Sequence, residues 1–169
     1  MATNSKNKII IGVMGPGSKD AREDDVPYAY EVGKLVAKNN HLLLCGGMTG
    51  VMEASAKGAS EGGGLVIGIC PTADKKDANQ YIDIPIVTGM GAGRNFMNIL
   101  SSDILVFIGV SSPGTLSELA YAIQLAKPTI ILRGNADLKN YVQKELKSEK
   151  VIFVETFIEL EKKLEELTK

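Results

Sequence analysis

Two glycine-rich segments carry hydroxyl groups in a pattern suited to binding an anion. Residues 46–50 read GGMTG and residues 109–118 read GVSSPGTLSE, and helical spacing of apolar residues follows each. A glycine-lined turn at a helix N-terminus presents free backbone N–H groups and the positive end of the helix dipole, which favours a phosphate. A tight turn with an ordinary N-cap explains the first segment equally well, because Thr49 is placed to cap a helix that starts near Val51.

An arginine and a glutamate could add charge beside these turns. Arg94 follows residues 88–93 (TGMGAG) and falls in the first turn of an expected helix, where a cation is unfavourable. A bound anion or a carboxylate such as Glu118 would offset that charge, and an exposed arginine is the alternative. Thr115 and Glu118 also fit a capping box, so a structural role for Glu118 competes with one in a cleft.

A third glycine-rich segment, residues 12–18 (GVMGPGS), permits close approach of the backbone to a ligand. It is not a Walker A loop, because no Gly-Lys-Ser/Thr follows. It is also a poor dinucleotide fingerprint, since the next strand ends in Cys45 where an NAD site would place a ribose-binding carboxylate. We therefore expect neither NAD nor PLP as a cofactor.

The histidine and cysteine content excludes several kinds of active site. His41 is the one histidine, and we expect it at the start of a strand, on the edge opposite the glycine loops, which excludes a His-dependent triad there. Cys45 and Cys70 end apolar runs and are typical of buried, reduced thiols. No Cys/His cluster has zinc spacing, so we expect no metal site. Asn79 and Tyr81, within residues 72–83, could overhang the cleft as a lid.

Seven short apolar segments alternate with longer amphipathic ones, which predicts strands joined by helical crossovers. The expected strands are residues 8–14, 41–45, 65–70, 84–87, 104–108, 129–132 and 151–154; the expected helices are 26–39, 51–61, 94–101, 116–126, 136–147 and a terminal helix capped by Thr156 and Glu159. Such connections are right-handed and make strands parallel. We predict an α/β, Rossmann-like, doubly wound, mainly parallel sheet of about seven strands in three layers, with the glycine loops on one rim.

Composition bounds the class of protein. The 169 residues, at 18.0 kDa, suit a single domain spanning residues 1–169. A 44% hydrophobic and 23% charged composition with mean hydropathy +0.05 excludes a disordered chain and argues against membrane spans. A net charge of −1, 5% aromatic residues and no tryptophan argue against nucleic-acid binding. Residues 1–8 lack a signal-peptide pattern, so we expect a cytoplasmic location.

The motifs resemble those of the SLOG superfamily of Rossmann-like proteins over about residues 8–133. The matching segments are residues 46–54, 58–59, 62–63, 67–69, 71, 94–95 and 114–119. Within the superfamily, the chain is most similar to the molybdenum cofactor carrier proteins, with TGMG before Arg94 and GTLSE at residues 114–118. A second similar branch is the Lonely Guy type phosphoribohydrolases, which release a base from a nucleoside 5′-monophosphate.

Resemblance to the carriers implies a cytosolic homodimer or homotetramer that binds the terminal phosphate of molybdopterin, the molybdenum cofactor, without chemistry, and that has molybdoenzymes as possible partners. The residues expected to bind this phosphate-bearing ligand are Gly15, Gly17, Ser18, Gly46, Gly47, Thr49, Gly50, Arg94, Asn95, Ser111, Ser112, Gly114 and Thr115. Resemblance to the hydrolases implies instead that Arg94 and Glu118 are catalytic, with the 5′-phosphate on Gly114 and Thr115.

Two departures from the hydrolase pattern favour binding over hydrolysis. The hydrolases carry Pro-Gly-Gly-x-Gly-Thr-x-x-Glu, whereas Ser111, Ser112 and Pro113 precede Gly114 here, which restricts the backbone and adds hydroxyl donors. Arg94 is followed by Asn95 in place of the usual lysine. A nucleotide-sensing or DNA-handling module is a third alternative, because the superfamily includes DNA-processing proteins.

Overall fold

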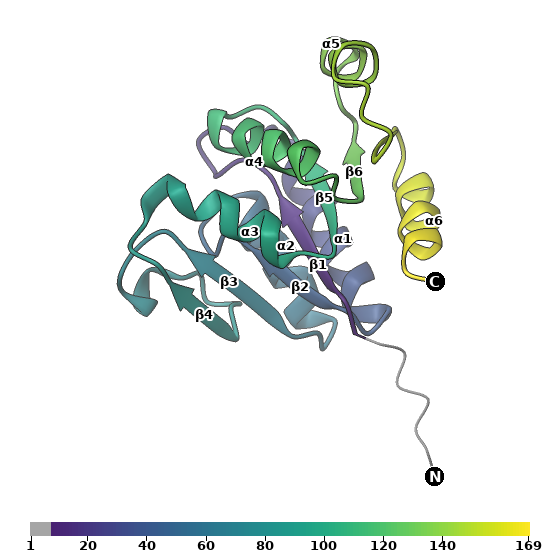
Figure 1. The fold of residues 1–169 in the computed structure, drawn as a ribbon. Helices are drawn as coiled ribbons and strands as arrows, with labels where there is room; N and C mark the ends of the chain where they lie inside the picture. Colours follow the sequence, from purple (N-terminus) through teal and green to yellow (C-terminus); the bar gives the residue numbers. More distant parts are fainter. Residues whose placement is uncertain (1–7) are drawn as a thin grey trace.

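Seven parallel strands form the centre of the molecule in the computed structural model, which describes residues 8–169 (Figure 1). The strands are β1 (Ile10–Met14), β2 (Leu42–Cys45), β3 (Val66–Cys70), β4 (Ile84–Val87), β5 (Ile104–Ile108), β6 (Thr129–Leu132) and β7 (Val151–Val154). Their order in the sheet is β4-β3-β2-β1-β5-β6-β7, and every neighbouring pair is parallel. The predicted fold class is confirmed. The segment used to argue against a signal peptide lies largely in residues 1–7, outside the described residues.

Helices cover both faces of this sheet, which explains why its central strands are continuously apolar. One face packs against α1 (Asp25–Lys38), α2 (Val51–Glu61) and α6 (Phe157–Leu167); the other packs against α3 (Asn95–Ser101), α4 (Pro113–Gln124), α5 (Ala136–Asn140) and the π-helical turn Tyr141–Glu145. Leu160 and Leu164 of α6 join the first core, and Leu119 of α4 joins the second. Among the helices of the described chain, none is long and apolar enough to cross a membrane.

Local capping contacts confirm one boundary and correct others. Thr156 and Glu159 form the predicted capping box of α6. The expected cap of α2 by Thr49 is wrong, because Gly50 occupies the N-cap position and no side chain bonds the helix start. The expected helix 136–147 divides into α5 and the wider turn that follows it.

Helix α4 begins three residues earlier than the predicted residue 116. Ser112 is its N-cap and accepts a hydrogen bond from the Thr115 backbone N–H at 3.2 Å, while Pro113 occupies the first turn. Proline is favoured there because its fixed φ suits a helix and its missing N–H is not needed. Of the two roles considered for Glu118, the capping box with Thr115 is therefore excluded, because Ser112 occupies the N-cap position.

The order in which the strands are added to the sheet reverses at β1. It adds β2, β3 and β4 on one side and then returns to place β5 on the other side of β1. The loops leaving β1 and β5 consequently diverge at the carboxyl rim, which is where ligands bind in sheets of this kind. A 3-10 turn, η2 (Gly91–Arg94), leads into α3 on this rim.

Candidate functional site

A small pocket lies at the carboxyl ends of β1 and β5, with a volume of about 110 Å³. Its lining consists of Val13, Met14, Gly15, Gly17, Gly46, Met52, Arg94, Asn95, Ser112, Gly114, Thr115 and Glu118. Pockets that enclose a whole small molecule have volumes of about 300–1,000 Å³. This pocket therefore suits a compact group such as a phosphate, with the rest of a larger ligand outside it.

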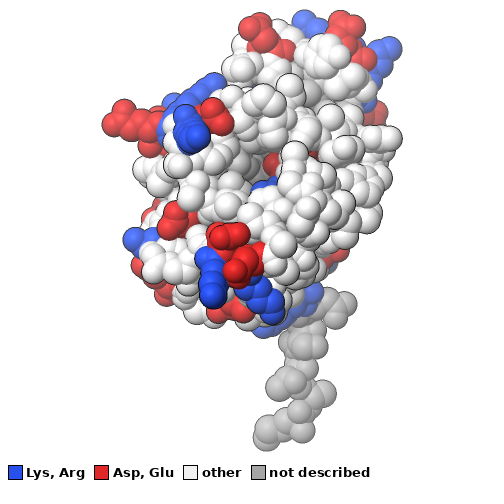
Figure 2. Space-filling view, turned by 90° about the vertical axis from the view of Figure 1, so that its left-hand side faces the viewer, with Lys and Arg blue, Asp and Glu red and all other residues white. Residues whose placement is uncertain are grey.

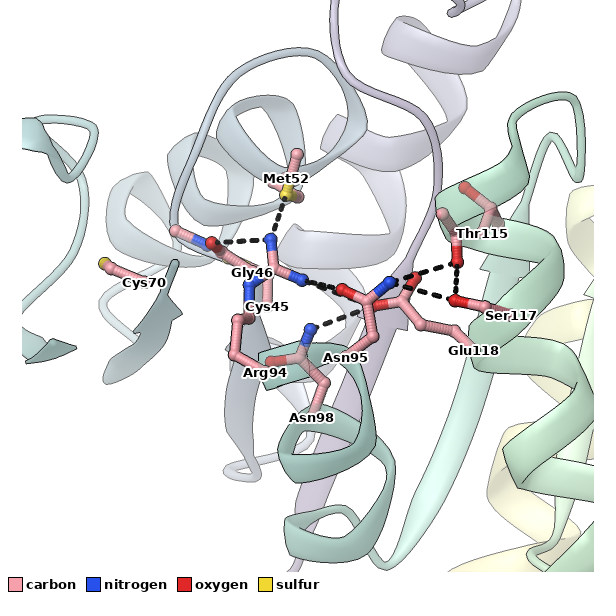
Figure 3. A network of polar contacts seen from close by, with 12 residues as sticks. Cys45, Gly46, Met52, Cys70, Arg94, Asn95, Asn98, Thr115, Ser117 and Glu118 are labelled. Carbon is pink, nitrogen blue, oxygen red and sulfur yellow. Dashed lines mark hydrogen bonds and ion pairs between the residues drawn. The ribbon is translucent and has the colours of Figure 1, made fainter. Parts of the chain in front are cut away.

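Arg94 lies at the centre of a buried polar network (Figure 3). Its Nη2 donates to the carbonyl oxygen of Gly46 at 3.2 Å and lies 3.8 Å from the Met52 sulfur. Its Nη1 donates to Asn95 Oδ1 and lies 3.5 Å from Glu118 Oε1. The carboxylate expected to offset the Arg94 charge is thus Glu118.

The Arg94 guanidinium lies so close to the turn after β2 that position 46 has no room for a side chain. A Cβ built on Gly46 would overlap Arg94 Nη2 and would lie 2.7 Å from the Met52 sulfur. Side chains would have to move before any larger residue fitted. The glycine-rich turn therefore admits an arginine from a distant helix start, a contact between residues 48 positions apart.

Glu118 projects from α4 into the interior and reaches the same network. Its side chain is buried, and its Oε1 accepts a hydrogen bond from Asn98 Nδ2 at 2.8 Å. Burial raises the pKa of Glu118 from 4.5 to about 7, while the Asn98 hydrogen bond and the Arg94 charge act in the opposite direction. A carboxyl group with a pKa near neutrality can exchange a proton at physiological pH.

The start of α4 supplies uncharged hydrogen-bond donors. Ser112 Oγ and Thr115 Oγ1 lie 3.0 Å apart, and only 2% of Thr115 is exposed. Asn95 Nδ2 donates to Gly114 O at 3.3 Å and to Ser117 Oγ at 3.0 Å, which ties α3 to α4. Ser112 accepts the N–H groups of Thr115 and Leu116, and Pro113 has no N–H. The start of α4 therefore offers an anion the Gly114 N–H and the positive end of the helix dipole.

The structure brings together most, though not all, of the residues that the sequence placed in the site. Gly15, Gly17, Gly46, Arg94, Asn95, Ser112, Gly114, Thr115 and Glu118 line the pocket; Ser18, Gly47, Thr49, Gly50 and Ser111 do not. The hydroxyls of Ser18 and Thr49 lie 3.2 Å apart and bridge the loops after β1 and β2. Ser111 Oγ donates to Asp20 O at 2.9 Å, which holds the loop after β5 against the loop after β1.

Four contributors were not expected from the sequence. Val13 and Met14 lie at the end of β1 and line the pocket, and Met52 contacts Arg94 from the first turn of α2. Asn98 holds the Glu118 carboxylate and is fully buried. Its position four residues after Arg94 was the available signal, because residues i and i+4 share one face of a helix.

Other candidate groups lie outside the pocket. Asn79 Nδ2 donates to Met48 O at 2.8 Å, and Tyr81 lines a different hollow, so neither residue covers the pocket as a lid. Cys45 and Cys70 are free and buried, and burial raises the pKa of Cys45 to about 12. Within residues 8–169, no group of three or more His, Cys, Asp or Glu side chains could hold a metal ion.

The fold and this site define a member of the SLOG proteins. The chain belongs to the SLOG cluster4 family, whose model matches residues 8–161. It is 45% identical over 131 residues to an uncharacterized protein of Archaeoglobus fulgidus, covering 73% of this chain and 83% of that one.

Two similar solved structures are those of a carrier protein and a binding protein of the molybdenum cofactor. The molybdenum cofactor carrier protein of Chlamydomonas reinhardtii is 38% identical, with a TM-score of 0.87 over 95% of this chain and 98% of that one. The molybdenum cofactor binding protein of Rippkaea orientalis is 38% identical, with a TM-score of 0.86 over 95% of this chain and 94% of that one.

Proposed function

We propose that the protein is a cytoplasmic carrier of the molybdenum cofactor and that the pocket at the start of α4 binds the cofactor's terminal phosphate. The observation that carries the proposal is the small volume of the pocket, about 110 Å³, combined with its lining of hydroxyl and backbone donors. The similarity to a carrier protein and a binding protein of this cofactor supports the identity of the ligand.

The residues present fit a phosphate ester. Ser112 and Thr115 offer hydroxyl groups, and the start of α4 offers the Gly114 backbone N–H. Arg94 Nε is buried and has no partner within the described residues, so one charged donor stays available. The pterin, too large for the pocket, would lie on the rim beside the loops after β1 and β2, and release would require no covalent step.

The proposal is tested by loading the purified protein with molybdopterin under anaerobic conditions, removing free ligand, and oxidising the bound material to a fluorescent pterin. We expect pterin fluorescence in the protein fraction and its loss when inorganic phosphate competes. A protein that retains no pterin, or that retains only adenine nucleotides from a metabolite extract, would contradict the carrier assignment.

Hydrolysis of nucleoside 5′-monophosphates is the second candidate function. The observation that favours it is Glu118, whose pKa of about 7 and position 3.5 Å from Arg94 suit an acid that assists cleavage of an N-glycosidic bond. Incubation with AMP and cytokinin riboside monophosphates should then release free base, and Glu118→Gln should abolish the release. Intact nucleotide after incubation with the wild type leaves binding as the function.

We further propose that the carrier is a homo-oligomer that forms through the outer surface of α3 and α4. The apolar residues exposed there are Met90, Phe96, Met97, Leu100 and Leu116. The two helices carry one charged residue between them, Glu118, and it is buried. A second copy could meet this surface without facing like charges, and interface cores are depleted of charge and rich in aromatic residues and methionine.

A further inference from the structure

The pocket has no surplus positive charge to offer an incoming dianion. Arg94 and Glu118 are the two ionisable side chains among its lining residues, and Arg94 Nη1 lies 3.5 Å from Glu118 Oε1. When both are ionised, their charges cancel. Figure 2 shows a hollow near the centre of a largely uncharged face, with Lys, Arg, Asp and Glu gathered mainly toward the margins.

The Arg94 guanidinium is also largely occupied before any ligand binds. Its Nη2 donates to Gly46 O and contacts Met52, and its Nη1 is shared by Asn95 Oδ1 and Glu118 Oε1. A dianion in the same small pocket would therefore lie close to the ionised Glu118 carboxylate, in a site shielded from water. Like charges in such a site disfavour ionisation of the weaker acid.

We infer that Glu118 takes up one proton from solvent when the phosphate group binds, so that the bound complex contains a neutral Glu118. This inference rests on the proposed phosphate site. The proton forms an O–H bond on the carboxyl group, and no other bond forms or breaks. Oε1 already accepts the Asn98 hydrogen bond, whereas no residue of the described chain bonds Oε2. A proton on Oε2 keeps the Asn98 contact and converts a repelling group into a donor.

Glu118 is the one group of this network that titrates near neutral pH. The elements packed against it contribute Arg94 from η2, Asn98 from α3 and Cys45 from β2, while the pocket residues of β1 are uncharged. Burial holds the Cys45 thiol in its neutral form, with a pKa of about 12. The arginine stays charged, so a proton taken up on binding goes to Glu118, whose pKa is about 7 in the free protein.

The expected consequence is a pH-dependent affinity. Below about pH 7 Glu118 is already protonated, and binding takes up no proton. Well above this pH, Glu118 is ionised in the ligand-free protein. Each further pH unit should then weaken binding about tenfold, until the pH exceeds the pKa of Glu118 in the complex. Glu118 thereby makes retention of the cargo depend on pH.

Calorimetric titration with sulfate at about pH 8, in two buffers of different ionisation enthalpy, measures the proton uptake directly. Sulfate remains a dianion throughout the neutral range, whereas phosphate groups have a second pKa of about 6 and would contribute protons of their own. We expect uptake approaching one proton per bound sulfate at pH 8. Because Glu118 is half ionised at about pH 7, the affinity should fall about fivefold from pH 7 to pH 8.

Glu118→Gln removes the ionisation while keeping a side chain of similar size. We expect this variant to bind sulfate with no proton uptake and with the same affinity at both pH values. Glu53→Gln is the matched control, because Glu53 lies in the first turn of α2 and outside the pocket. It should behave as the wild type does. If Glu118→Gln does not fold, the wild-type titration decides alone.

The outcomes separate this inference from the proposed function. Sulfate that binds without proton uptake, and equally well at pH 7 and pH 8, overturns the inference and leaves the phosphate site intact. If neither sulfate nor inorganic phosphate binds at any pH between about 6 and 9, the proposed phosphate site fails and the inference fails with it. If phosphate binds and sulfate does not, the two-buffer comparison is made with phosphate, corrected for its own ionisation, and decides in the same way.

Discussion

At the scale of single residues, the burial of Glu118 makes the stability of the fold depend on pH. Burial raises the pKa of Glu118 from 4.5 to about 7, so the folded protein holds this proton more tightly than the unfolded chain. The resulting stability is complete below about pH 4.5 and is lost as pH rises through about 7. Relative to Glu118→Gln, the wild type should lose about 3 kcal/mol of unfolding free energy over this range. Urea titrations of both proteins across this pH range measure the difference in unfolding free energy. If the unfolding free energies of the two proteins changed equally with pH, Glu118 would not be the group responsible.

Removing the Thr115 hydroxyl tests whether Thr115 contacts the ligand or has only a structural role. Ser112, not Thr115, caps α4, so Thr115→Val keeps the cap while removing a donor from the pocket. We expect binding of phosphate-containing ligands to weaken by about 1–3 kcal/mol. Thr168→Val, at the end of α6, provides a control with the same chemistry. Equal affinities of the two variants in calorimetric titrations would remove Thr115 from the site.

A substitution at Gly46 tests whether the Arg94 guanidinium must pack against the backbone of the turn after β2. In Gly46→Ala the added methyl overlaps Arg94 and the Met52 sulfur, so we expect a loss of about 1–3 kcal/mol of stability and weaker anion binding. In Gly93→Ala the added methyl meets Met90 at an ordinary 3.6 Å, which makes it the control. Thermal unfolding of both variants measures the difference, and equal stabilities would show that Arg94 moves aside without cost.

At the scale of elements, the N-terminus of α4 links helix stability to the site. Ser112 accepts a hydrogen bond from the Thr115 N–H and its hydroxyl also lies beside that of Thr115. Ser112→Ala should therefore lower the free energy of unfolding by about 1 kcal/mol, the usual cost of a lost cap. It should also weaken ligand binding, whereas Asn135→Ala, which removes the cap of the remote α5, should change stability alone. An effect of Ser112→Ala on stability without any on binding would limit it to capping.

The elements themselves were largely predictable from the sequence, and the exceptions have physical causes. Continuous apolar runs such as β5 identify buried parallel strands, because helices cover both faces of the sheet. The start of α4 was misjudged because Thr115 and Glu118 imitate a capping box. Ser112 and Pro113 make the better start, and Glu118 is drawn inward by Arg94 and Asn98. Contacts between residues so far apart in the chain leave no local pattern to read.

At the scale of the whole molecule, the exposed apolar surface of α3 and α4 predicts self-association. Met97→Glu would place a charge within this surface, where the 38% exposed Met97 side chain would otherwise be buried by a second copy. We expect the wild type to sediment as a dimer or tetramer and Met97→Glu to sediment as a smaller species. Ile158→Glu, on the 78% exposed Ile158 of α6, is the control on another surface and should leave the assembly intact. A wild type that is monomeric at micromolar concentration would contradict the prediction.

The pocket takes its walls from β1, the turn after β2, the start of α3 and the start of α4, so it exists only when the central half of the sheet has assembled. A ligand held there binds the native chain and not the unfolded one. A free ligand concentration of a hundred times the dissociation constant adds about 2.7 kcal/mol to the stability of the protein. The unliganded protein is consequently the less stable form. Cellular proteases would degrade it first, so the abundance of the protein would follow the supply of its ligand.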